Sequence, residues 1–367
     1  MDTLETLTQQ VMSGHKVTKE EALWLSKQPL EPLCRQADKI RRHFCQNTFD
    51  LCTIINGKSG RCSENCKFCA QSAHNHTGAD TYPLLSKEEI LADAKKQAAQ
   101  RVLRYSIVTA GKALSDKEID NMCDTIRQIR QETTLSVCVS FGLLTEPQFR
   151  RLKEAGVSRV HNNLETSEKH FPNICTTHTF ADKVSAIQAA QRAGLTVCSG
   201  GIMGMGETMA DRIDMALSLR ELGITSVPVN VLNPIPGTPF GEYPTLSEEE
   251  VLRILALYRF LLPAASIRMA GGRGLLPEGG KSCFLSGANA AITGDMLTTA
   301  GITVQTDLQM LTELGYEVKL DETTDDHQHR YGRRQNLRQW ADIEKITGKR
   351  QKSRLFQSGN ERQYPSF

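Results

Sequence analysis

The sequence predicts an α/β fold, a (β/α)8 barrel of the TIM type with a helical N-terminal extension and a basic C-terminal tail. Eight short runs rich in β-branched residues alternate with helical stretches across some 260 of the 367 residues. A doubly wound open sheet is the alternative, but the glycine fingerprint that would follow its first strand is missing. The expected strands cover residues 51–56, 104–110, 135–141, 158–165, 195–202, 226–232, 266–270 and 289–294.

Helical segments with recognisable ends separate these strands. They cover residues 86–100, 116–132, 145–156 and 247–262, among others. Ser86 and Ser247 are N-cap residues followed by acids, and Ser247 with Glu250 predicts a capping box. Glycines fall where helices should stop, at Gly156, Gly194 and Gly223.

The chain is expected to divide into three parts: a helical extension over 1–44, the barrel over 45–320, and a basic tail over 321–367. Residues 330–362 carry ten Lys and Arg against three Asp and Glu, although the whole chain has a net charge of only +2. A basic tail can attract nucleic acid. No nucleic-acid-binding module is recognisable there, so a solvated appendage is the favoured interpretation.

Composition places the chain among soluble proteins of a reducing compartment. No apolar run approaches the roughly 20 residues that a membrane helix needs. The first residues are polar and include acids early, unlike a secretory signal. A cytoplasmic location is therefore expected. Its 11 cysteines should be thiols, because that compartment keeps them reduced, and each is either a metal ligand or a small apolar residue.

Three cysteines form the most informative motif. Cys62, Cys66 and Cys69 have C-x3-C-x2-C spacing on the loop after the first expected strand. In a barrel this loop lies at the C-terminal face, where such enzymes place their chemistry. Three thiolates suit an iron–sulfur cluster with one open iron. A zinc site completed by His74 and His76 is one alternative, and three unrelated surface cysteines are the other.

Further segments make the sequence similar to one family. The cysteine motif resembles that of the radical S-adenosylmethionine (SAM) superfamily, and CSGGIMGMGET (198–208) resembles the segment that lies along adenine in that superfamily. The segments RVHNNLETS (159–167), VPVNVLNPIPGTP (227–239) and FLSGANAAITGDMLTT (284–299) look like those of the biotin synthase family. The resemblance extends over roughly residues 38–300.

The resemblance implies a reaction and a set of site residues. Members use a [4Fe–4S] cluster to cleave SAM into methionine and a 5′-deoxyadenosyl radical, and they insert sulfur into dethiobiotin. Cys62, Cys66 and Cys69 would hold the cluster. The residues that would contact SAM are Phe68, Asn163, Glu165, Gly201 and Gly204. The residues that would contact the substrate are Asn163, Asn230, Thr298 and Thr299.

Several of these residues have a structural alternative. The family often has Asp where this chain has Glu165. The two asparagines, on strands, could instead satisfy buried backbone groups, the glycines could form a tight turn, and the threonines could cap a short element.

The expected sulfur-donor site departs from the familiar pattern. A two-iron cluster held by three Cys and one Arg is usual; Cys138, Cys198 and Arg268 match three of those positions, but the fourth falls at Ser106. Cys52 appears on the neighbouring strand, and adjacent strands lie about 4.8 Å apart. We therefore expect Cys52, Cys138 and Cys198 to hold an auxiliary cluster, a four-iron type with an extra sulfide rather than [2Fe–2S].

The remaining residues and partners follow from that assignment. Cys198 is counted with the catalytic cysteines, and Arg268 is expected to line the auxiliary site. Cys45 and Cys175 are reserve ligands, whereas Cys34, Cys123 and Cys283 fit helical core positions. The resemblance also implies a flavodoxin or ferredoxin as electron donor and a homodimer. The alternatives are another radical SAM enzyme, of the methylornithine synthase or hydrogenase-maturation type, and a non-catalytic iron–sulfur redox protein.

Overall fold

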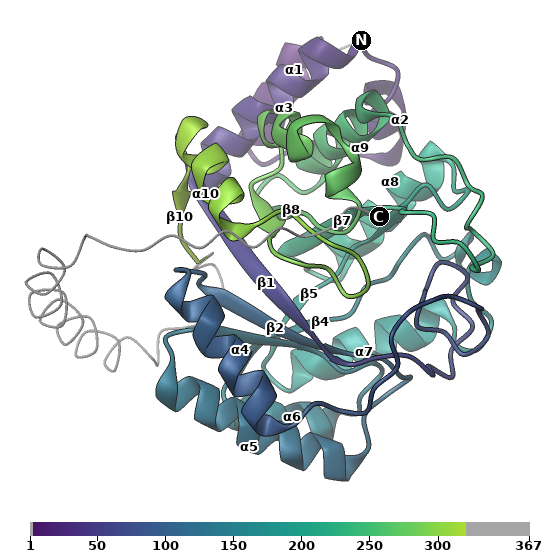
Figure 1. The fold of residues 1–367 in the computed structure, drawn as a ribbon. Helices are drawn as coiled ribbons and strands as arrows, with labels where there is room; N and C mark the ends of the chain where they lie inside the picture. Colours follow the sequence, from purple (N-terminus) through teal and green to yellow (C-terminus); the bar gives the residue numbers. More distant parts are fainter. Residues whose placement is uncertain (1–2, 321–367) are drawn as a thin grey trace, which may run out of the picture. The chain divides into compact units, whose positions relative to one another are not determined.

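A computed structural model describes residues 3–320, so the predicted basic tail lies outside the described residues (Figure 1). Parallel strands pair in the order β1-β2-β3-β4-β5-β7-β8-β9, with β6 beside β7, and β9 pairs back onto β1. The predicted barrel is thus confirmed. Its strands are β1 (Thr48–Lys58), β2 (Arg104–Thr109), β3 (Ser136–Ser140), β4 (Val157–His161), β5 (Thr196–Cys198), β6 (Gly201–Met203), β7 (Ser226–Val231), β8 (Ser266–Met269) and β9 (Ala290–Ile292).

The fifth position of the barrel is divided into two short strands, where the sequence predicted one strand over 195–202. β5 ends at Cys198 and β6 begins at Gly201. A Cβ atom on Gly200 would lie 1.9 Å from the carbonyl oxygen of Pro228, and one on Gly201 would lie 2.3 Å from that of Glu165. Only glycine allows this close approach of three backbones. The break therefore brings the chain between β5 and β6 close to the middle of β7 and to the segment that follows β4.

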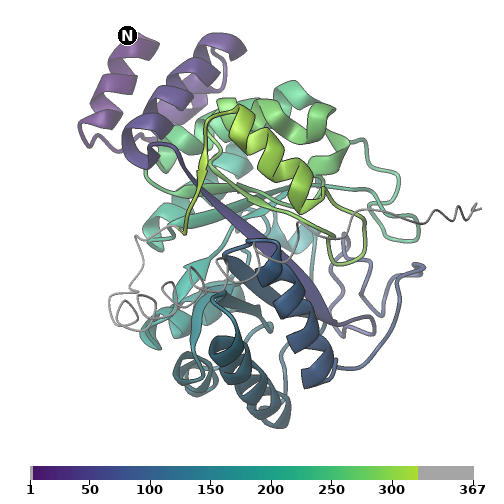
Figure 2. The same ribbon diagram turned by 60° about the vertical axis from the view of Figure 1, so that its left-hand side comes forward.

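Helices lie outside the strands in both views (Figures 1 and 2). Ser86 caps α4 in a complete capping box with Glu89. The box predicted at Ser247 is wrong in one half: the Ser247 hydroxyl accepts from the Glu250 amide, but the Glu250 carboxylate binds Arg212 at 2.6 Å instead. The outer helices are α4 (Lys87–Ala99), α5 (Asp116–Glu132), α6 (Glu146–Glu154), α7 (Phe180–Arg192), α8 (Met209–Glu221), α9 (Glu248–Leu261) and α10 (Val304–Glu313).

Three helices precede the barrel and pack on its outer layer. α1 (Leu4–Met12), α2 (Lys19–Leu25) and α3 (Leu30–Cys45) form a group in which α3 lies along α9 and α2 contacts α8 (Figure 2). After α10, the short strand β10 (Glu317–Val318) pairs with the start of β1. No helix within residues 3–320 has both the length and the apolar composition to cross a membrane.

Candidate active site

The cysteine motif lies on the loop that follows β1, at the carboxyl end of the barrel strands. The amide of Cys62 donates to Gln71 (3.0 Å), its carbonyl accepts from Ala73 (2.8 Å), and the amide of Cys69 donates to the Cys66 carbonyl (3.1 Å). All three thiols are half-buried. Within residues 3–320 the three do not form a group with every sulfur within 4.8 Å of the others.

The zinc alternative finds no support among the described residues. His74 and His76 are exposed, and a ring nitrogen of His74 lies 3.1 Å from the Ser63 carbonyl oxygen. Neither belongs to a possible single-metal group in residues 3–320. Asn75 shapes the loop instead, because its carboxamide donates to the carbonyls of Cys66 (3.2 Å) and Cys69 (2.9 Å).

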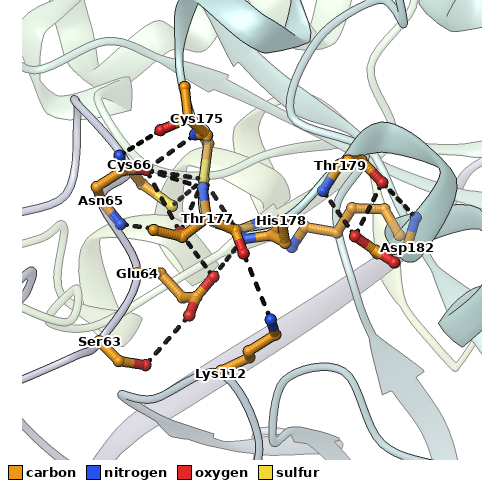
Figure 3. A network of polar contacts seen from close by, with 12 residues as sticks. Ser63, Glu64, Asn65, Cys66, Lys112, Cys175, Thr177, His178, Thr179 and Asp182 are labelled. Carbon is orange, nitrogen blue, oxygen red and sulfur yellow. Dashed lines mark hydrogen bonds and ion pairs between the residues drawn. The ribbon is translucent and has the colours of Figure 1, made fainter.

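A buried polar network joins this loop to the segment after β4 (Figure 3). Glu64 lies 2.6 Å from Nδ1 of His178 and accepts from the Thr177 hydroxyl at 2.8 Å. The sulfur of Cys175 lies 3.7 Å from that of Cys66 and 3.4 Å from Nδ1 of His178. Cys175, a predicted reserve ligand, therefore stands beside the C-x3-C-x2-C motif.

The electrostatics of this network follow from its hydrogen bonds. The contact between Cys66 and Cys175 raises the pKa of Cys66 and lowers that of Cys175, so the two sulfurs share a proton in the cluster-free chain. Burial alone would lower the pKa of His178, but hydrogen bonds to Cys175 and Glu64 raise it. Burial would likewise raise the pKa of Glu64, and hydrogen bonds from Thr177 and His178 lower it. The network favours a charged Glu64–His178 pair.

The residues expected to bind SAM converge beside the divided strand. Asn163 accepts from the Gly200 amide at 3.0 Å and donates to the Glu165 carboxylate at 3.3 Å. Glu165 has a left-handed φ of +72°, a strained conformation for a residue with a side chain. Hydrogen bonding and burial are the main causes that raise the pKa values of Cys66 and Cys69, and the nearby charge of Glu165 raises them further, so the carboxylate lies close to the cysteine loop.

The glycine segment after β6 is folded around a carboxylate. Gly204 has a φ of +101°, and its amide donates to Glu207 at 2.8 Å. The amide of Met205 donates to the same carboxylate at 2.7 Å, and Arg212 binds it from α8. Phe68, the aromatic residue of the cysteine loop, is half-buried against the apolar core.

The expected substrate residues lie on two elements. On β7, Asn230 donates to the Gly201 carbonyl at 3.1 Å and accepts from the Gly271 amide at 2.9 Å. Its carboxamide thus satisfies backbone groups, which is the alternative role considered for this residue from the sequence. Thr298 is exposed and Thr299 half-buried on the loop after β9, which is tied to β1 through the Leu297 carbonyl and Asn56 (3.0 Å).

Inside the barrel, a layer of charged residues underlies the other cysteines. Asp50 accepts from Arg104 (3.3 and 3.4 Å) and from Arg159 (3.4 Å), and it lies 3.2 Å from Arg268. All four side chains are buried. Burial would raise the pKa of Asp50, but the three guanidinium groups hold it far below its usual value.

Cys52, Cys138 and Cys198 are buried close to these charges. Cys52 follows Asp50 by two residues on β1, Cys138 pairs with Arg159 in the β3–β4 register, and Cys198 pairs with His161, two residues after Arg159 on β4. Burial is the main cause that raises the pKa of Cys52 and of Cys138; the charge of Cys138 adds to the first and that of Cys198 to the second, so these sulfurs lie near one another. Ser106 hydrogen-bonds to Cys138. The structure therefore brings the three predicted auxiliary cysteines together.

The thiols in this space differ in acidity. Burial raises the pKa of Cys52 to about 12. Burial also opposes ionisation of Cys198, but a hydrogen bond from His161 and the charges of Arg268 and Arg159 lower its pKa to about 6. These interactions favour the thiolate form of Cys198, which is the form that binds metal.

The other cysteines lie elsewhere. Cys45 ends α3, where its sulfur accepts from Arg259 of α9 at 3.4 Å. It is on the outer helical layer rather than in the barrel interior with Cys52. Cys123 and Cys283 are buried, and Cys34 is half-buried on α3.

Comparison with known proteins decides the family. The sequence pattern described as "Radical SAM superfamily" matches residues 58–219, and that of the "Biotin and Thiamin Synthesis associated domain" matches residues 228–317. The biotin synthase of Brachyspira hyodysenteriae is 59% identical over 319 residues, 87% of this chain and 96% of that protein. The chain belongs to the biotin synthase family. The biotin synthase of Akkermansia muciniphila is 56% identical over 320 residues, 87% of this chain and all of the relative.

Solved structures agree with this family at the level of the fold. A methylornithine synthase superposes with a TM-score of 0.75 at 20% identity, covering 85% of this chain and 97% of that one. An FeFe-hydrogenase maturase from Carboxydothermus hydrogenoformans gives 0.73 at 18%, covering 85% and 78%. As a radical SAM enzyme of the biotin synthase family, the chain uses a [4Fe–4S] cluster and SAM.

Sequence reasoning missed two groups of site residues. One is the Glu64–His178 network, whose members lie 114 residues apart without a shared motif. The other is the charged layer of Asp50, Arg104 and Arg159. The sequence does contain a pattern that could have predicted this charged layer. Asp50 precedes Cys52 by two residues and Arg104 precedes Ser106 by two, so each pair lies on one face of a strand.

Proposed function

We propose that this chain is a biotin synthase that inserts sulfur into dethiobiotin at the carboxyl end of the barrel. Family membership at 59% identity over 87% of the chain is the observation that carries this proposal. Cys62, Cys66 and Cys69 would hold the [4Fe–4S] cluster, which would supply the electron for SAM cleavage. Asn163, Glu165 and the neighbouring glycines orient SAM, and the closed barrel excludes water from the radical.

The sulfur comes from an auxiliary cluster held by Cys52, Cys138 and Cys198. Their shared interior space and the buried positive charge beneath them support an anionic iron–sulfur group there. A serine at position 106 makes a two-iron cluster of the usual kind unfavourable, and a four-iron type with an extra sulfide is the better fit. Arg268 lines this site, because its Nη1 is occupied by the carbonyls of Asp50 and Ala291.

Each of two carbons would lose one hydrogen atom to a 5′-deoxyadenosyl radical made from one SAM. Each carbon radical would then form a C–S bond to the same sulfide, and the two electrons released would pass to ferric iron of the auxiliary cluster. Phe68 and Gly204 would pack near adenine, and Asn230, Thr298 and Thr299 would hold dethiobiotin. A flavodoxin or ferredoxin would deliver the electrons, and the enzyme would act as a cytoplasmic homodimer. The radical SAM relatives of similar fold have no need of sulfur delivery, so the inward cysteines favour biotin synthase over them.

The test is an anaerobic incubation of reconstituted protein with SAM, a reductant and dethiobiotin, read by mass spectrometry. Biotin together with 5′-deoxyadenosine is expected, and Cys52→Ser should abolish biotin while 5′-deoxyadenosine persists. If 5′-deoxyadenosine forms without biotin while the auxiliary site is loaded, the substrate is wrong. If reduced, loaded protein cleaves no SAM, the enzyme assignment itself fails.

A further inference from the structure

The charged layer beneath the auxiliary cysteines is not neutral. Three guanidinium groups, of Arg104, Arg159 and Arg268, surround the single carboxylate of Asp50, and all are buried. Three positive charges against one negative charge leave an excess of positive charge among these buried side chains. An uncompensated buried charge is strongly unfavourable, and a bound anion beside these arginines would lower that free-energy cost.

The unused hydrogen-bond donors show which arginines would hold that anion. Nε and Nη2 of Arg159 have no partner within residues 3–320, and Nη2 of Arg268 lies near Asp50 without hydrogen-bond geometry. Arg104 differs, because its Nε and Nη2 bind Asp50 and its Nη1 binds Ser136 at 3.1 Å. Arg159 is 1% exposed and Arg268 2%, so bulk solvent does not reach these groups.

The free donors of Arg159 stand next to the cysteines. Arg159 pairs with Cys138 in the β3–β4 register. Its Nη1 donates to the Ser226 hydroxyl at 3.2 Å, and that hydroxyl donates to the Cys198 sulfur at 3.3 Å. The positive charge of Arg159 acts on both of these thiols. An anion bound to Arg159 would therefore lie within the same space as the auxiliary cysteines.

We propose that Arg159, with Arg268, forms an anion site that holds the sulfide transferred in the reaction. A sulfide is a hydrogen-bond acceptor with two negative charges, and a guanidinium fork presents parallel N–H groups to such a ligand. Arg159 is a positioning residue, because it binds the sulfur atom that the cysteines and iron deliver. This inference rests on the proposed sulfur insertion and names the residues that bind its sulfur. The sulfide can be free hydrosulfide or a sulfide of the auxiliary cluster.

The first experiment uses full-length, cluster-free protein under anaerobic conditions. Arg159→Met should unfold no lower than wild type and is expected about 2 °C higher, because it removes an uncompensated charge. Arg104→Met is the matched control and should unfold lower, because every donor of Arg104 is bonded. A purely structural Arg159 would lower the unfolding temperature in the same way, and that result would overturn the proposal.

The second experiment measures bound sulfide. After loading with ferrous iron and sodium sulfide, Arg159→Met should lose at least half of the acid-labile sulfide beyond that of the SAM cluster, and Arg159→Lys should lose less. Sulfide content equal to wild type would overturn the proposal. If sodium sulfide alone, but not sodium chloride, raises the unfolding temperature of wild type, the bound anion is free hydrosulfide. If the protein retains sulfide only when iron is also added, the bound anion is a sulfide of the auxiliary cluster.

Neither measurement depends on biotin formation, so the two proposals fail separately. An Arg159-dependent sulfide in protein that makes no biotin would leave the anion site standing and reject the substrate. Biotin formation by Arg159→Met at the wild-type yield per chain, with full sulfide content, would reject the anion site and leave the enzyme assignment standing.

Discussion

Replacing Asp50 by Asn tests the electrostatic account of the barrel interior. The change keeps the shape of the side chain and removes its charge, which faces three arginines at 3.2–3.4 Å. At an effective dielectric constant of about 20, each contact is worth about 5 kcal/mol. The neutral side chain no longer has the desolvation penalty of a buried carboxylate, and this offsets much of the lost Coulomb attraction. Breaking a buried ion pair therefore destabilises a protein by about 3–5 kcal/mol. We expect a loss of about 5 kcal/mol because three partners are affected.

Urea and thermal unfolding of the cluster-free protein measure this loss, which corresponds to about 7 °C in unfolding temperature for a chain of this length. Asp80→Asn, on an exposed loop residue, is the matched control and should change stability by less than about 0.5 kcal/mol. Combining Asp50→Asn with Arg159→Met should recover part of the loss, because the excess positive charge falls. A loss below about 1 kcal/mol for Asp50→Asn would refute the reasoning.

The pH dependence of this effect has a definite sign. The pKa of Asp50 in the folded chain lies well below its ordinary value of 3.8, which describes the unfolded chain. Its contribution is therefore present above about pH 4 and is lost as the pH falls further. Wild type and Asp50→Asn should differ most near neutral pH and converge in acid.

Three further outcomes are expected. Gly201→Ala should lower the free energy of unfolding in urea by about 3 kcal/mol, because the new Cβ would lie 2.3 Å from a backbone oxygen. Gly78→Ala is the control and should change it little, because no atom lies within 4 Å of a Cβ at that position. Equal losses of stability would contradict the close approach at Gly201. In the cluster-free chain the Cys66 thiol donates to Cys175. Once Cys66 has lost its proton to bind iron, the Cys175 thiol is expected to donate to it instead, and such a hydrogen bond raises the reduction potential. Cys175→Ala should therefore lower the reduction potential of the SAM cluster by tens of millivolts in an EPR titration, and Cys175→Ser should lower it less; an unchanged potential in both variants would exclude that role. Cys52 has a pKa of about 12, so it must lose a proton when it binds iron, and loading the auxiliary site at pH 7 should release that proton to an indicator dye. Cys52→Ser should release fewer protons on loading. Equal proton release by the two proteins would contradict Cys52 as a ligand.

Local patterns were sufficient for much of the architecture and for the cysteine motif. Runs of β-branched residues between capped helices predicted each barrel strand, and the boundaries of α5 agree with the predicted 116–132. The division of the fifth strand was not predictable, because it depends on how close Pro228 and Glu165 come to Gly200 and Gly201. Those partners are distant in sequence.

Spacing along the chain alone determined that Cys62, Cys66 and Cys69 share a loop, since residues within eight positions cannot separate far. Tertiary structure decided which distant side chains join them: Cys175 beside Cys66, His178 against Glu64, and three arginines around Asp50. The physical reason is closure of the barrel. The alternation of side chains shows which residues share a face of each strand, but only the pairing of β9 with β1 turns those faces toward one interior, where a single carboxylate meets three guanidinium groups.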